Sequence, residues 1–197
     1  WQPVLVHTEQ HWDYEMSQIF FEELELPQPQ YRLTPPSRDP DAMIRAIQRE
    51  LEAVMVKEAP RWVIVVGDVN STAAGAVAAK KARLLLAHVE AGLRSFDLGM
   101  PEEKNRIITD HLSDILFVTE PSGVANLKRE GIAAEKIHLV GNVMIDALIS
   151  VLDKIRERKS CQRWGLEVGH YVLVTIHRPS NVDTKEALEK TFKILQA

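Results

Sequence analysis

Ionisable side chains crowd together directly after an apolar stretch in the middle of the chain. The run LLLAHV at residues 84–89 is followed by six of them: Glu90, Arg94, Asp97, Glu102, Glu103 and Arg106. Carboxylates can act as general acids or bases, and cationic side chains stabilise the charge on a departing phosphate group. This combination predicts a site that transfers a proton and holds an anion.

Four apolar runs end in polar residues of this kind: Asp68, Glu90, Gly141-Asn142 and His177-Arg178. In an open parallel sheet, ligands bind outside the carboxyl ends of the strands. We therefore expect these side chains to line one pocket. A helix that opens at Ser71 would add backbone N–H groups and a partial positive charge, both suited to phosphate.

Structural roles are also open to the acidic residues. Asp68 could be only a turn or capping residue, and Glu90 could pair with Arg94 or Arg106. Glu102 and Glu103 follow Pro101, and the helix dipole favours acidic side chains in any first turn.

The histidines have structural alternatives too. His88 lies two residues before Glu90 and could be a metal ligand, although a histidine with satisfied hydrogen bonds is favoured. His177 and Arg178 could belong to an ordinary loop.

Apolar periodicity predicts the elements that position these residues. Strands are expected at residues 3–8, 61–68, 84–90, 114–119, 136–142 and 172–176, with a brief strand near 31–33. Helices are expected at residues 13–24, 41–58, 70–82, 102–112, 121–131 and 143–159, and from residue 184. The stripes expected to be buried are Met16, Ile19, Phe20 and Leu24 in the first helix, and Ile44, Ile47, Leu51, Val54 and Met55 in the second. Such continuous apolar strands between helices indicate a parallel sheet covered on both faces.

Composition narrows the class of protein. The chain has 197 residues and a formal net charge of −4, so it is not expected to bind nucleic acid. Cys161 is the single cysteine, which fits a reducing cytosol. No apolar run approaches the roughly 20 residues of a membrane span, and we expect a cytoplasmic protein without a membrane partner. We expect a domain at residues 1–160, a linker at 161–169, and the start of a second domain at 170–197.

Several motifs together resemble the non-hydrolysing UDP-N-acetylglucosamine 2-epimerase family. They are HTEQHWDYEMSQIFFEELELP, a GD pair followed by a helix cap, HVEAGLRS with PEEKNR, VGNVMIDAL and VTIHRPSNVD, and they cover nearly the whole chain in order. The resemblance implies a glycosyltransferase-B-like architecture, in which two Rossmann-like domains hold the sugar nucleotide in the cleft between them. It also implies a homodimer that needs no metal and no NAD and supplies precursors for cell-surface polysaccharides.

The resemblance also implies a reaction and its residues. The family interconverts UDP-GlcNAc and UDP-ManNAc by anti-elimination of UDP, which gives a 2-acetamidoglucal, and by re-addition of UDP. Asp68, Glu90 and Glu102 match its acidic catalytic positions, and His177 matches a histidine that contacts UDP. Candidates for phosphate binding, or for orienting carboxylates, are Arg94, Arg106 and Arg178, with Asn142 as a further substrate-binding residue. Gln10 and His11 fall in a loop that holds a regulatory UDP-GlcNAc in some members.

Departures from the family pattern lead to further expectations. The family's first strand, with its Gly-Thr-Arg-Pro-Glu motif, and most of its second domain have no counterpart here. We therefore expect a partial chain that is inactive and poorly stable alone, because unpaired buried backbone groups cost about 1–3 kcal/mol each. Alternative activities are epimerisation of a related UDP-diacetamido sugar, a hydrolysing epimerase, a glycosyltransferase of the same architecture, and a non-catalytic sugar-nucleotide sensor.

Overall fold

The computed structural model describes residues 1–10, 14–34, 39–176 and 178–196. It forms two compact units, Trp1–Ser150 and Val151–Ala197, which are described separately below. The division falls within a helix, so the predicted domain boundary near residue 160 stays a prediction. Among the described residues, no helix is both long enough and apolar enough to cross a membrane.

A four-stranded parallel sheet forms the centre of the first unit. Its strands follow the order of the chain: β3 (Trp62–Val66), β4 (Leu85–Ala91), β5 (Ile115–Val118) and β6 (Ile137–Leu139). A separate two-stranded parallel sheet pairs β1 (Val6–His7) with β2 (Tyr31–Arg32). The α/β class and the parallel arrangement predicted from the sequence are confirmed.

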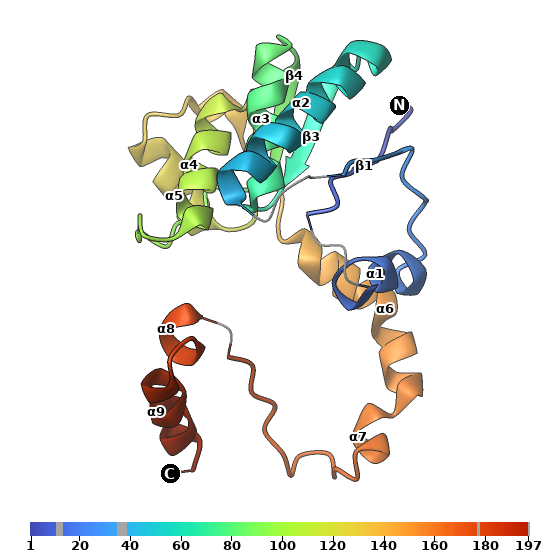
Figure 1. The fold of residues 1–197 in the computed structure, drawn as a ribbon, viewed down its shortest axis with the longest axis vertical. Coiled ribbons are helices and arrows are strands. Elements are labelled where there is room, and N and C mark those ends of the chain that lie inside the picture. The colour runs from blue at the N-terminus through green and yellow to red at the C-terminus, as the bar shows by residue number, and fades with distance from the viewer. Residues whose placement is uncertain (11–13, 35–38, 177, 197) are drawn as a thin grey trace. The chain divides into compact units, whose positions relative to one another are not determined.

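Helices cover one face of the larger sheet, side by side (Figure 1). They are α2 (Pro40–Glu58), α3 (Asn70–Lys81), α4 (Pro101–Leu112) and α5 (Pro121–Arg129). Right-handed crossovers between strands in sequence order place the connecting helices on the same face. Ile64 and Val66 of β3 remain 64% and 53% exposed. The expectation that helices cover both faces is therefore wrong for β3 in the part of the chain that the structure describes.

The main core lies between α2, α3 and the sheet. The predicted apolar stripe of α2 is confirmed, because Ile47, Leu51 and Met55 are buried against alanines of α3 and against Leu86 of β4. A second cluster contains Leu116 and packs α5 against β5. These two clusters fix the strands whose ends carry the candidate site.

The remaining elements are η1 (Tyr14–Met16), α1 (Gln18–Glu23), η2 (Ala134–Lys136), α6 (Val143–Arg158), α7 (Ser160–Arg163), α8 (Pro179–Val182) and α9 (Lys185–Gln196). Two predictions about the remaining parts of the chain are wrong. The stripe expected in the first helix is wrong: Phe21 is buried, whereas Phe20 is 51% exposed. The α-helix also begins later than predicted, at Gln18. The strand expected at residues 172–176 is also wrong, because no described residue pairs with this stretch.

Candidate active site at the carboxyl edge of the sheet

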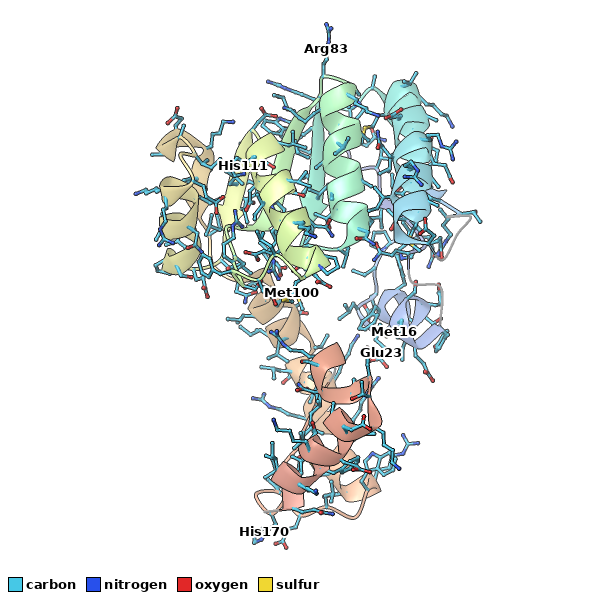
Figure 2. All side chains as sticks on the ribbon, turned by 60° about the vertical axis from the view of Figure 1, so that its left-hand side comes forward. Met16, Glu23, Arg83, Met100, His111 and His170 are labelled. Carbon is cyan, nitrogen blue, oxygen red and sulfur yellow. The ribbon has the colours of Figure 1, made fainter. Side chains whose placement is uncertain are left out.

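The candidate site lies where β3 and β4 end. Figure 2 labels Arg83, which precedes β4, and Met100, which precedes α4, at opposite ends of the sheet and helix layers. Val66 of β3 is in register with Val89 of β4, so both strands end at the Met100 edge. The segments that carry Asp68 and Glu90 and the first turn of α4 therefore meet there, as the sequence predicted.

Glu90 has an unusual backbone conformation. The register between β4 and β5 shifts between Val89 and Ala91, and the φ angle of Glu90 is 70°. A β-bulge redirects a side chain, and a left-handed conformation in a residue other than glycine stores strain that is common at functional sites. As a result, a Cβ atom placed on Gly67 would lie 3.6 Å from Glu90 Oε2. The Glu90 carboxylate thus lies beside the turn that carries Asp68.

Asp68 is held by two residues of α4. Its Oδ2 accepts a hydrogen bond of 2.5 Å from Arg106 Nη2, and its backbone carbonyl accepts one of 2.9 Å from Asn105 Nδ2. Arg106 Nη1 also donates to Glu103 Oε2 at 3.1 Å. Asp68 keeps a side-chain exposure of 30%. Arg106 therefore orients carboxylates, which was one of the two roles expected for it.

The adjacent residues Glu102 and Glu103 have different environments. Glu103 is 1% exposed and accepts hydrogen bonds from the backbone N–H groups of Ser95 and Phe96 and from the Ser95 hydroxyl. The side chain of Glu102 forms no hydrogen bond or ion pair with any described residue. It lies one turn before Arg106, on the same face of α4. Glu103 therefore holds the loop before α4, whereas Glu102 is available for a ligand.

The pKa of Glu103 gives a prediction for stability against pH. Burial alone would raise this pKa, but the hydrogen bonds from Ser95, Phe96 and Arg106 outweigh burial and lower it below the ordinary value. A lowered pKa in the folded state adds stability above the unfolded pKa, which is lost as the pH falls through the folded pKa. We expect the free energy of unfolding of Glu103→Gln to fall less than that of the parent chain as the pH drops below about 4.3.

Urea unfolding at a series of pH values measures this effect, with Glu135→Gln as the exposed control. If Glu103→Gln and the parent chain lose stability in parallel between pH 5 and pH 3, the hydrogen bonds do not favour the ionised form.

Arg94 is sealed inside the protein. Its side chain is 1% exposed, and its guanidinium group binds Asp110 Oδ2 at 2.7 Å and both carboxylate oxygens of Glu130 at 2.7 Å. Burial would lower the pKa of Arg94, but the hydrogen bonds and charges of Glu130 and Asp110 outweigh burial and raise it. Arg94 thus orients carboxylates, and the structure contradicts a role in phosphate binding because no face of the group is open to a ligand.

Other predicted residues lie outside this cluster or outside the described residues. The Oδ1 atom of Asn142 accepts the Met144 N–H at 2.9 Å and so caps α6. Gln10 Oε1 accepts the Ser71 N–H at 2.9 Å, and so occupies one of the donors expected to bind phosphate. His11 and His177 lie outside the described residues. Arg178 belongs to the second unit, so its place relative to Asp68 and Glu90 stays a prediction.

The metal alternative for His88 finds no support in the geometry. Both of its ring nitrogens are within 2.8 Å of protein oxygens, one from Asp110 and one from Gly67. No group of three or more His, Cys, Asp or Glu side chains in the described part of the chain could hold a metal ion. The favoured alternative, a histidine with satisfied hydrogen bonds, is confirmed.

Two residues of the cluster were not predicted from the sequence. Asn105 is buried and binds the Asp68 carbonyl, and Asp110 is fully buried and binds His88 and Arg94. Asp110 lies in the last turn of α4, where the helix dipole disfavours a negative charge. That unfavourable position is the signal that could have identified it.

Comparison with known proteins decides the family. A statistical model of the UDP-N-acetylglucosamine 2-epimerase family matches residues 1–197. The chain belongs to this family. The resemblance in its motifs is confirmed, and so is the Rossmann-like, glycosyltransferase-B-like fold class.

Individual relatives agree with the family assignment. A UDP-N-acetylglucosamine 2-epimerase homolog of Methanococcus maripaludis is 45% identical over 95% of this chain and 53% of the relative. The UDP-2,3-diacetamido-2,3-dideoxy-D-glucuronate 2-epimerase of Pseudomonas aeruginosa is 44% identical over 91% of this chain and 50% of the relative. The crystal structure of Methanocaldococcus jannaschii UDP-GlcNAc 2-epimerase with UDP-GlcNAc and UDP superimposes with a TM-score of 0.88, at 43% identity, over 97% of this chain and 54% of that one. The chain thus spans about half the length of the curated relatives that it matches.

Proposed function

We propose that the natural protein carrying this chain interconverts UDP-GlcNAc and UDP-ManNAc by eliminating UDP and adding it back. The main supporting observation is that the Glu90 carboxylate lies beside the turn of Asp68, and that Glu102 lies one helical turn before Arg106, which binds Asp68. The side chains of Glu90 and Glu102 have no partner among the described residues. Carboxylates without protein partners can bind a ligand or exchange a proton with it. Membership of the 2-epimerase family supports a UDP-sugar as this ligand.

The reaction needs two enzyme groups near carbon 2 of the sugar, a base that removes a proton and an acid that returns one. Removing the weakly acidic C–H proton requires a placed base, and a carboxylate serves when its surroundings tune its pKa. Asp68 forms an ion pair with Arg106, whereas the side chains of Glu90 and Glu102 form none with the described residues. Which of these carboxylates removes the proton and which returns one is left open.

The departing UDP needs cationic groups or hydrogen-bond donors on its pyrophosphate. Arg94 cannot serve, because it is buried between two carboxylates. His177 and Arg178 are proposed for this role on the basis of the family motif VTIHRPSNVD. The cytoplasmic location, the homodimer and the regulatory role of Gln10 and His11 stay predictions.

A second candidate function is epimerisation of a UDP-diacetamido uronic acid. It is favoured by the Pseudomonas aeruginosa relative, which is 44% identical, close to the 45% of the Methanococcus maripaludis relative. Both activities would use the same acidic residues and would differ in the contacts to carbons 3 and 6 of the sugar.

Incubation of the natural protein with UDP-GlcNAc in deuterated water tests the proposal. We expect UDP-ManNAc with deuterium at carbon 2, because the proton returned there comes from an enzyme carboxyl that has equilibrated with solvent. Epimerised product without deuterium would contradict proton exchange at that carbon. Free N-acetylmannosamine with stoichiometric UDP would show the hydrolysing reaction instead, and turnover of only the diacetamido uronate nucleotide would select the second candidate.

A further inference from the structure

A buried chain of charged and polar groups runs beneath the candidate active site. His88 of β4 and Asp110 of α4 are both 0% exposed, and Nδ1 of the histidine lies 2.7 Å from Oδ1 of the aspartate. The other oxygen of Asp110 accepts hydrogen bonds from Arg94 at 2.7 Å and from the Gly92 N–H at 3.1 Å. Burying a charged group this completely costs several kcal/mol of folding free energy unless the group is paired. The pairing of these side chains is therefore important for the stability of the fold.

The partners of His88 determine which hydrogens its ring carries. Nδ1 faces the Asp110 carboxylate, and Nε2 lies 2.8 Å from the carbonyl oxygen of Gly67. A carbonyl oxygen can only accept a hydrogen bond, and Asp110 accepts from a guanidinium group and from a backbone N–H, as an ionised carboxylate does. Nε2 therefore carries a hydrogen, and an ionised Asp110 requires a hydrogen on Nδ1 as well.

These contacts connect the two segments that carry the catalytic candidates. The Gly67 carbonyl belongs to the peptide bond that leads into Asp68, and the Gly92 N–H lies two residues after Glu90. The segment after Glu90 is also confined by close packing, since a Cβ atom on Gly92 would come within 2.6 Å of the Gly123 carbonyl oxygen. A shift of Asp110 or of His88 would thus be transmitted to both segments.

We infer that His88 and Asp110 are positioning residues, which tie the Gly67 carbonyl to the segment after Glu90 and so fix the distance between the Asp68 and Glu90 carboxylates. Both side chains are 0% exposed, so neither is open to a ligand. The predicted change in kcat rests on the proposed function, whereas the predicted hydrogens on the His88 ring do not. A misplacement of about 1 Å in a catalytic group can cost about 100-fold in rate.

The first test is spectroscopic and needs no substrate. In ¹⁵N-labelled protein, the His88 ring should show a hydrogen on each of its two nitrogens. In Asp110→Asn, the amide can donate to Nδ1 while its oxygen accepts from Arg94 and Gly92, so the ring should keep a hydrogen on Nε2 alone. A parent ring with only one N–H, or a ring unchanged by Asp110→Asn, would overturn the inference.

The second test separates positioning from general stability. His88→Gln offers one donor group and one acceptor, so its carbonyl must face either Asp110 or Gly67. We expect kcat to fall about 100-fold, with KM changed less than threefold, since binding groups are untouched. His138→Gln, on the exposed side of β6, is the matched control and should keep its kcat.

A double variant supplies the chemical rescue. In His88→Gln with Asp110→Asn, the asparagine amide can donate to the glutamine carbonyl, and the glutamine amide can donate to Gly67. We expect kcat to recover at least tenfold over His88→Gln, or, if His88→Gln does not fold, a folded double variant within tenfold of the parent kcat. Folded variants in which His88→Gln matches the parent, or in which the double variant recovers nothing, would refute positioning.

The two proposals fail in distinguishable ways. A parent protein that does not epimerise any UDP-sugar refutes the proposed function, while the ring spectrum of His88 still decides the protonation. An active parent whose His88→Gln variant is equally active refutes only the positioning role.

Discussion

Glu90→Gln is expected to lower kcat for epimerisation by about 10²–10⁴-fold, the range typical of a lost general acid or base. The amide keeps the size of the side chain but can neither accept nor return a proton. The side chain of Glu90 has no hydrogen bond or ion pair with any described residue, so the substitution removes none. The measurement is the rate of UDP-ManNAc formation by the natural protein under saturating UDP-GlcNAc.

The control for this prediction is Glu135→Gln, an exposed glutamate in η2 on the same unit. Its kcat should equal that of the parent. A Glu90→Gln variant that binds UDP-GlcNAc and retains more than a tenth of the parent kcat would remove Glu90 from the list of catalytic groups.

Arg94→Met is expected to cost about 3–5 kcal/mol of unfolding free energy, the range for removing one partner of a buried ion pair. The substitution removes the guanidinium partner of Asp110, which is fully buried. It also frees Glu130, whose side chain is 26% exposed and can take up water. Urea unfolding followed by circular dichroism measures the loss.

Arg156→Met is the matched control for this stability prediction. Arg156 pairs with Asp153 on α6, where the two side chains are 72% and 90% exposed. Exposed pairs contribute about 0–1 kcal/mol, so the control should unfold almost as the parent does. Equal losses for the two variants would show that the Arg94 contacts add little to the fold.

Much of the architecture could be predicted from local patterns. Continuous apolar runs predicted β3, β4, β5 and β6, and the stripe containing Ile47 and Leu51 predicted the buried face of α2. Patterns of this kind succeed because burial on a sheet or beneath a helix leaves a periodic trace in the sequence. The stretch at residues 172–176 shows the limit, because a strand also needs a partner and apolar residues alone do not supply one.

The candidate site was predicted less completely than the fold. The placement of Asp68 and Glu90 at one edge follows from the parallel sheet, but the bulge at Glu90 does not, since glutamate has no preference for a positive φ angle. The division of roles between Glu102 and Glu103 also depends on the loop that contains Ser95. Spacing alone could not separate two adjacent carboxylates, because only the folded loop decides which of them is buried.

Arg94 illustrates why residue type is a weak guide to role. A guanidinium group suits a phosphate and a carboxylate equally well. Arg94 binds carboxylates here because Glu130, at the end of α5, and Asp110 of α4 contact it in the folded chain.

A crystal structure of the natural protein with UDP-GlcNAc tests the central claim most directly. We expect the sugar ring at the carboxyl edge of the sheet, with carbon 2 about 3–3.5 Å from a carboxylate oxygen of Asp68, Glu90 or Glu102, as a reacting pair requires. A sugar ring bound elsewhere, with carbon 2 facing none of these three carboxylates, would contradict the claim that this edge is the active site.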